Sequence, residues 1–266
     1  MSILMCPKCS MPLKLNEKTY RCVNNHCYDI SKKGYVNLLM SQKSSKKRHG
    51  DDKAMIYARK SFLSKGYYDM LCDNVIGLAK KHFAGGAYLD LGCGECYYTE
   101  RIKNAVSPSC TVALDISKDA LNIAQSDAVK IVASVSKIPV FSDSCNLVTN
   151  IFAPIKESEV KRVLTKNGLL VRAVPLERHL FSLKSAVYEK PYENAHDETA
   201  LEGFELVDST ELKTKITIDN NEDILKLFMM TPYYYKTSSA DFQRLNSLDT
   251  LETEIEVNFL AYKPLK

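Results

Sequence analysis

The chain has no unbroken apolar run of about 20 residues, which is the length a helix needs to cross a bilayer, so no membrane-spanning segment is expected. Its start, Met-Ser-Ile-Leu-Met-Cys, lacks the basic stretch and long apolar core of a secretory signal. No internal repeat or low-complexity tract is visible. The nine cysteines suit a reducing compartment better than a disulfide scaffold, and we therefore expect a cytoplasmic protein.

An excess of charge of one sign is also lacking. The chain has 36 lysines and arginines against 32 acidic residues, and its formal net charge of +4 permits a nucleic-acid partner without requiring one. A length of 266 residues with 45% hydrophobic residues is enough for one α/β domain and a small additional module.

Two close pairs of potential metal ligands stand near the start of the chain. Two residues separate Cys6 from Cys9, three separate Cys22 from His26, and twelve lie between the pairs. Three thiolates and one imidazole complete a tetrahedral zinc shell without water, so the ion would stabilise the fold and activate nothing. Cys27 is the rival fourth ligand, but its side chain should point away if His26 points toward the ion. Free core cysteines are the alternative, which the paired spacing disfavours.

The composition divides the chain into three segments. Residues 1–40 are expected to form a zinc-binding module of short hairpins, whose core is too small to be stable without metal. Residues 41–53 are polar and basic, and they form either a solvated linker or a phosphate-contacting loop. The basic run contains Lys43, Lys46, Lys47, Arg48 and His49. Residues 54–266 are expected to form the main domain.

Apolar periodicity predicts the elements of the main domain. Residues 54–82 are helical in pattern, with a break at Gly66-Tyr67-Tyr68. Predicted strands at 88–91, 111–114, 130–133, 146–151 and 169–174 alternate with predicted helices around 97–104, 118–126 and 157–164. This alternation favours right-handed βαβ units and a mainly parallel sheet with helices on both faces. Two further strands are predicted at 213–218 and 254–262, with one short helix around 224–228 between them.

The strand at 88–91 runs into a glycine turn, Gly92-Cys93-Gly94-Glu95-Cys96. Gly92 and Gly94 would let the backbone approach a ligand closely, and the helix that follows presents free amides. Asp115 closes the second strand about 20 residues further on, where it would hold a ribose diol. Asp90, just before the turn, disfavours a pyrophosphate and suits a cationic ligand without phosphates. S-adenosylmethionine meets these conditions.

Three other interpretations of this turn are possible. A nicotinamide dinucleotide would require a third glycine where Cys96 stands. Cys93-Gly94-Glu95-Cys96 also matches a redox Cys-x-x-Cys motif at a helix start, but redox chemistry leaves Asp115 unexplained. A turn that serves only strand–helix packing is the remaining alternative.

The chain resembles the RlmA-type 23S rRNA (guanine-N1-)-methyltransferases over essentially its whole length. The runs that carry the resemblance are Cys6-Pro-Lys-Cys, Cys22 with His26, Gly34-Tyr-Val-Asn-Leu-Leu, Leu89-Asp-Leu-Gly-Cys-Gly-Glu with Tyr97-Tyr-Thr, Leu114-Asp-Ile-Ser-Lys, Phe152-Ala-Pro, Arg178-His-Leu and Met230-Thr-Pro. The resemblance implies a Rossmann-like class I methyltransferase sheet with a small N-terminal zinc-binding domain. It also implies zinc at the four paired residues, and cofactor contacts from Tyr68, Gly94, Glu95 and His179, with Asp115 on the ribose.

One position departs from the family pattern, because Cys96 replaces the glycine usual in the loop. A cysteine at positive φ would be strained by about 1 kcal/mol or more. Glu95 and the tyrosines that follow favour the branch that modifies guanine 745 over the branch that modifies guanine 748.

The implied activity is methyl transfer from S-adenosylmethionine to N1 of a guanine in a 23S rRNA hairpin, by a homodimer with a shared RNA cleft. N1 lies on the Watson–Crick edge, so the base must be unpaired or splayed out. The sequence identifies no general base, and residues 150–154 are expected to line the acceptor side. The run Tyr233-Tyr234-Tyr235 could stack on bases or alternate in a strand.

Three other functions remain open from the sequence. A methyltransferase for a different substrate, either another nucleic acid or a small molecule or protein, would keep the cofactor turn. A zinc-dependent RNA-binding protein with an inactive methyltransferase fold is the non-enzyme alternative, which Cys96 supports. An NAD-dependent oxidoreductase is disfavoured by Asp90.

Overall fold

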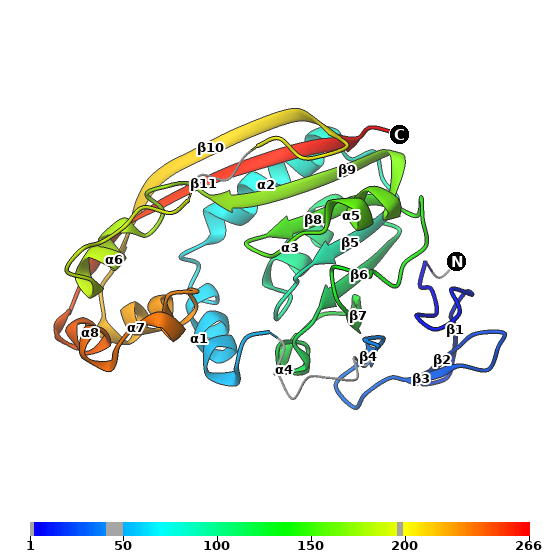
Figure 1. Cartoon of the computed structure of the whole chain (residues 1–266), viewed down its shortest axis with the longest axis horizontal. Coiled ribbons are helices and arrows are strands. Elements are labelled where there is room, and N and C mark those ends of the chain that lie inside the picture. Colours follow the sequence, from blue (N-terminus) through cyan, green and yellow to red (C-terminus); the bar gives the residue numbers. More distant parts are fainter. Residues whose placement is uncertain (1–2, 41–49, 196–198) are drawn as a thin grey trace.

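The structure, a computed structural model, describes residues 3–40, 50–195 and 199–266. A sheet of eight strands in the order β10-β11-β9-β8-β5-β6-β7-β4 runs through it (Figure 1). The strands from β9 to β4 are parallel to their neighbours, whereas β11 and β10 extend the sheet antiparallel at the other edge. The mainly parallel sheet and the α/β class predicted from the sequence are confirmed.

The predicted strands all form, several of them longer than predicted. They are β5 (Ala87–Leu91), β6 (Cys110–Asp115), β7 (Val129–Val132), β8 (Cys145–Ile151), β9 (Leu164–Pro175), β10 (Phe204–Ile218) and β11 (Leu251–Pro264). Every residue of β5 is buried, because a parallel sheet has both of its faces covered. The edge strand β10 exposes many of its residues, so its apolar pattern is weak and the sequence indicates only its last six residues.

Helices cover the sheet on both sides. The long ones before β9 are α1 (Lys53–Leu63), α2 (Asp69–His82) and α3 (Tyr97–Val106), and the short ones are α4 (Lys118–Ile123) and α5 (Glu157–Val163). The predicted break between α1 and α2 is confirmed, and Gly66 lies there with φ +82°. At the other end of α1 the Asp52 side chain accepts a hydrogen bond from the Met55 amide (2.9 Å) and caps the helix.

A helical lobe at one end of the sheet differs from the prediction. It consists of α6 (Phe181–Val187), α7 (Asn221–Met229), α8 (Ser239–Gln243) and the 3₁₀ segments η1 (Tyr234–Lys236) and η2 (Arg244–Ser247). The short helix predicted around 224–228 is confirmed as α7, whereas η1, α8 and η2, which also lie between β10 and β11, were not predicted. The strand alternative for the tyrosine run is wrong, because residues 234 and 235 lie in η1. Figure 1 shows the lobe beside α1, at the end of the molecule opposite the zinc module.

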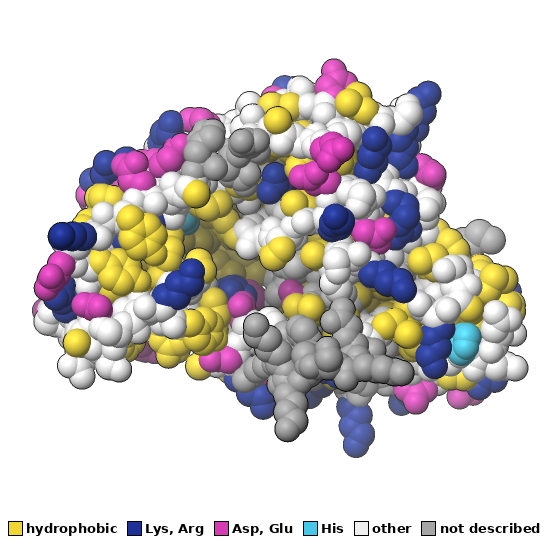
Figure 2. All heavy atoms as spheres, viewed as in Figure 1, with side chains coloured by type: hydrophobic (Ala, Val, Ile, Leu, Met, Phe, Trp, Pro, Cys, Tyr) yellow, Lys and Arg dark blue, Asp and Glu magenta, His cyan; other side chains and the backbone are white. Residues whose placement is uncertain are grey.

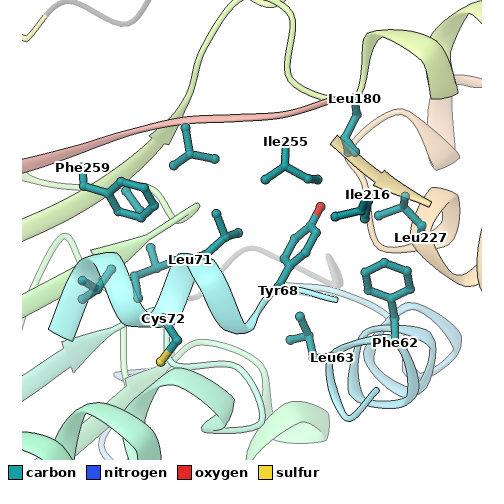
Figure 3. Packing of buried hydrophobic residues seen from close by; sticks show 14 of the residues in the cluster. Phe62, Leu63, Tyr68, Leu71, Cys72, Leu180, Ile216, Leu227, Ile255 and Phe259 are labelled. Carbon is teal, nitrogen blue, oxygen red and sulfur yellow. The ribbon is translucent and has the colours of Figure 1, made fainter. Parts of the chain in front are cut away.

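The two faces of the sheet pack into separate apolar clusters. Tyr88 of β5 belongs to one cluster, with α1, α2 and the helical lobe, whereas its neighbour Leu89 belongs to the other. Alternate residues of a strand point to opposite faces, which explains this division. In Figure 3, Tyr68 and Leu71 at the start of α2 point toward Ile255 of β11. This packing fixes the start of α2 against the sheet.

The N-terminal module is joined to the main domain by strand pairing. Its own antiparallel sheet comprises β1 (Lys14–Asn16), β2 (Thr19–Arg21) and β3 (Cys27–Asp29). The next strand, β4 (Tyr35–Asn37), pairs in parallel with β7 and belongs to the large sheet. The division at residue 40 stays a prediction. The predicted basic run at 43–49 lies outside the described residues.

The surface has a hollow between the helical lobe and the rest of the molecule, with hydrophobic side chains gathered on the lobe side (Figure 2). Among the described residues, no helix is both long enough and apolar enough to cross a bilayer.

Candidate functional site

The four predicted metal ligands converge. The ligand atoms of Cys6, Cys9, Cys22 and His26 all lie within 4.8 Å of one another. Nδ1 of His26 is 3.5 Å from Sγ of Cys6 and 3.4 Å from Sγ of Cys22, and the sulfurs of Cys9 and Cys22 are 3.6 Å apart. Tetrahedral zinc with bonds of about 2.0–2.3 Å holds its ligand atoms about 3.5–3.8 Å apart. The donor set and its spacing therefore fit a structural zinc ion.

Two tight turns and one phenol support the zinc ligands. Residues Ser10 and Asn25 have φ of +60° and +58°, and each ends a turn in which its amide bonds back to a ligand cysteine. The Tyr28 hydroxyl lies 3.2 Å from Sγ of Cys6, where it can donate to a thiolate. Cys27 is exposed and its sulfur contacts the Asn25 carbonyl, so this rival ligand points away as expected.

The glycine turn after β5 is held in a left-handed conformation that suits close backbone approach. Gly92 and Gly94 have φ of +78° and +56°. The Gly94 amide donates to Oδ2 of Asp115 (2.8 Å), and the Ser117 amide donates to Oδ1 (2.7 Å). The glycine turn and Asp115, which the sequence predicts to act together, are thus joined by hydrogen bonds at the carboxyl ends of β5 and β6. Burial raises the pKa of Asp115, and the two amides oppose that rise.

Asp90 faces into the protein. Its carboxylate is 2% exposed and accepts hydrogen bonds from the hydroxyls of Thr99 (2.5 Å) and Thr149 (2.8 Å). Because Thr149 donates to Asp90, the Tyr88 hydroxyl 2.8 Å away donates to Thr149. Asp90 therefore ties β5 to the first turn of α3 and to β8.

Arg59 of α1 lies beside the glycine turn and has no sequence motif that marks it. Its guanidinium forms an ion pair with Asp51 (2.6 Å), and a methyl group at Gly94 would lie 4.0 Å from Nη1. Glu95 is 8% exposed; burial raises its pKa and Arg59 opposes the rise. The Arg59 guanidinium thus feels the charges of three acidic side chains, those of Asp51, Glu95 and Asp115.

The predicted residues Tyr68 and His179 lie beside each other. Their ring centroids are 6.5 Å apart, and Phe152 stacks on His179 at 5.7 Å with an interplanar angle of 23°. Burial, with the charge of Lys184, lowers the pKa of His179 to about 3, so its ring is neutral. Nδ1 accepts a hydrogen bond from the Glu256 amide (3.2 Å), which leaves the proton on Nε2.

Comparison with known proteins assigns both parts of the chain. The family described as "RlmA, N-terminal" matches residues 4–47, and the family described as "Methyltransferase domain" matches residues 89–172. A "23S rRNA (guanine(748)-N(1))-methyltransferase" of Streptomyces fradiae is 27% identical and covers 98% of this chain and 97% of its own length. A "Putative 23S rRNA (guanine-N(1)-)-methyltransferase" of Micromonospora griseorubida is 31% identical over 68% of each chain. The chain belongs to the RlmA-type 23S rRNA (guanine-N1-)-methyltransferase family.

A third member of the family, the "Putative 23S rRNA (guanine-N(1)-)-methyltransferase YxjB" of Bacillus subtilis (strain 168), is 26% identical and covers 97% of this chain and 96% of its own length. The relatives from Streptomyces fradiae and Bacillus subtilis therefore match this chain across both its N-terminal module and its large sheet.

The site fits the S-adenosylmethionine that this methyltransferase family uses. The acidic side chains around the turn suit a sulfonium cation, and Asp115 keeps free lone pairs for a diol after accepting two amides. The Tyr98 hydroxyl is buried and has no hydrogen-bond partner in the described structure, so a polar ligand would satisfy it.

Cys96 lies at φ +68°, and the strain expected for this departure from the family loop is therefore present. Replacing it by glycine should give a more stable protein than replacing it by alanine, by about 1 kcal/mol, because both changes remove the sulfur and only glycine accepts this backbone without strain. Urea unfolding of Cys96→Gly and Cys96→Ala measures the difference. Equal stability, or a more stable alanine variant, would contradict it.

Burial raises the pKa of Asp90 to about 6 despite the two hydroxyl donors, whereas the unfolded chain has a value of about 3.9. The carboxyl is thus disfavoured in its charged form, so its contribution to stability is greatest below pH 4 and falls as the pH rises to 6. The fall amounts to about 3 kcal/mol. As the pH rises from 4 to 7.5, we expect the free energy of unfolding of Asp90→Asn to increase by up to that amount relative to that of the unsubstituted protein. Parallel pH profiles of urea unfolding would contradict this.

Proposed function

We propose that this protein transfers the methyl group of S-adenosylmethionine to N1 of a guanine in a hairpin of 23S rRNA. When bound, the cofactor supplies an electrophilic methyl group on a sulfonium. The observation that carries the proposal is the amide-bonded unit of Gly94 and Asp115, in a chain that also holds the zinc module of this family. Positioning of donor and acceptor would supply most of the rate acceleration.

We propose the cofactor contacts from the place of the side chains around the glycine turn and from the family resemblance. Asp115 would hold the ribose diol, and the backbone of Gly92 and Gly94 would pass close to the ligand. Glu95, Tyr68 and His179 remain the contacts that the family resemblance implies. To these we add Arg59, whose guanidinium could exchange Asp51 for the carboxylate of the methionine part.

His179 would act as a hydrogen-bond donor and not as a general base. Its Nδ1 already accepts from the Glu256 amide, and a pKa of about 3 makes protonation at neutral pH unfavourable. The Nε2–H group is the one left to hold a carbonyl or carboxylate oxygen.

The zinc module would present the RNA by shape and phosphate contacts, helped by the basic run at 43–49 and by a second copy of the chain in a homodimer. For the target we propose guanine 745, because Glu95 and the tyrosines after Cys96 match that branch. The Streptomyces fradiae relative is named for guanine 748. The two positions must therefore be separated by experiment.

The test is methyl transfer to 23S rRNA from a strain that lacks the gene, read by primer extension. A new stop that requires S-adenosylmethionine, at the step before guanine 745, is expected. A stop at guanine 748 would correct the target only. RNA binding without cofactor binding in calorimetry, and without any stop, would favour an inactive methyltransferase fold.

A further inference from the structure

Phe152 is an exposed aromatic residue with a strained backbone, at the carboxyl end of a central strand. It follows β8 directly, has φ +50° and is 41% exposed. A bulky residue at positive φ is an outlier, and such strain concentrates at functional sites. Neither burial in the core nor turn formation explains why a phenylalanine stands at this point.

The backbone around Phe152 is fixed on both sides. Its amide donates to the Ala173 carbonyl of β9 (3.1 Å). The Asn150 side chain donates to the carbonyls of Leu91 (3.4 Å) and Pro154 (3.2 Å), which ties the segment to the end of β5. The backbone that carries the ring is therefore held by hydrogen bonds to both neighbouring strands.

Phe152 also stands at the border of the cofactor turn. A methyl group at Gly92 would lie 2.5 Å from Cβ of Ala153, so the residue after Phe152 touches the turn. On its other side the ring stacks on His179 (5.7 Å, 23°). His179 is itself immobilised, because the amide of Glu256 donates to Nδ1 and the Asn194 side chain donates to its carbonyl (3.2 Å).

We propose that the exposed face of Phe152, backed by the neutral ring of His179, is the platform on which the target guanine stacks. This rests on the proposed function. A purine taken out of its helix loses its stacking partners, and an aromatic side chain replaces them. The place beside the cofactor turn would bring the edge of such a base toward the methyl donor. Phe152 is in this sense a positioning residue for the acceptor.

The experiment compares Phe152→Ala, Phe152→Leu and Phe152→Tyr in the full chain, with 23S rRNA as the acceptor and saturating S-adenosylmethionine. Base stacking on an aromatic ring predicts that the alanine and leucine variants lose about 5- to 150-fold in kcat/KM for RNA. The tyrosine variant keeps its flat ring and should stay within about threefold. Affinity for S-adenosylmethionine, measured by calorimetry, should be unchanged in all three.

Leu206→Ala on β10 is the matched control, since Leu206 is 42% exposed and lies on the edge strand of the sheet. It should change none of these values. A leucine variant as active as the unsubstituted protein would overturn the platform, because apolar contact alone would then suffice. Loss of cofactor affinity in parallel with activity would overturn it too. If the unsubstituted protein modifies no 23S rRNA, the proposed function fails and the platform with it. If Phe152→Ala does not fold, the leucine–tyrosine comparison still decides.

Discussion

Cys22→Ser is expected to unfold the zinc module and to reduce rRNA methylation to background. The module has only short strands of three residues each, so its own core cannot hold it. Structural zinc sites in small modules contribute about 10–16 kcal/mol of apparent binding energy, far more than such a core supplies. The module shares an apolar cluster with one face of the large sheet, but the cluster on the opposite face contains no described module residue and should keep the sheet folded. Amide hydrogen exchange over residues 3–30, together with zinc content, measures the effect.

The chain offers a matched control one residue from a ligand. Cys27→Ser changes the same atom at an exposed position whose sulfur contacts only the Asn25 carbonyl in the described structure. It should keep one zinc per chain and full methylation. Zinc loss in Cys27→Ser, with retention in His26→Ala, would show that Cys27 and not His26 is the fourth ligand. Cofactor affinity that survives in Cys22→Ser would assign the module to RNA and not to the methyl donor.

The zinc ligands and the glycine turn could be predicted because their residues are neighbours in sequence. Cys6 and Cys9 share one tight turn, and Gly92 follows directly from β5, so spacing alone places these residues. The long strands of the parallel sheet are buried on both faces and therefore leave continuous apolar runs in the sequence.

Features joined only by tertiary packing could not be predicted. Arg59 lies on a helix before the first predicted strand of the sheet, and nothing local indicates that its guanidinium reaches Asp51 beside the cofactor turn. The stacking of Phe152 on His179 joins the ends of different segments. Helix α6 is short, and its N-cap, Leu180, has a left-handed backbone and no side-chain cap, so no start signal appears in the sequence.

Gly92→Ala is expected to abolish cofactor binding and to destabilise the whole main domain. The residue has φ +78°, where alanine is strained, and the added methyl would stand 2.5 Å from Cβ of Ala153. The turn cannot move easily, because the amides of residues 92 and 93 donate to the Leu114 carbonyl. The segment after β8 is held as well, since the Phe152 amide donates to the Ala173 carbonyl. Strain and overpacking together should cost about 2–5 kcal/mol of unfolding free energy.

The control for this change is Gly77→Ala in the middle of α2, where an added methyl meets no atom within 4 Å and φ is not in the left-handed range. Alanine is the better helix former there, so the free energy of unfolding of this variant should rise by about 0.5–1 kcal/mol, and it should bind S-adenosylmethionine normally. If Gly92→Ala lowers the free energy of unfolding and Gly77→Ala raises it, the effect at Gly92 comes from the close approach at the turn and not from the loss of a glycine in general. If Gly92→Ala bound the cofactor as well as Gly77→Ala does, the turn would not be the cofactor cradle, because its backbone would tolerate the displacement that the methyl group forces.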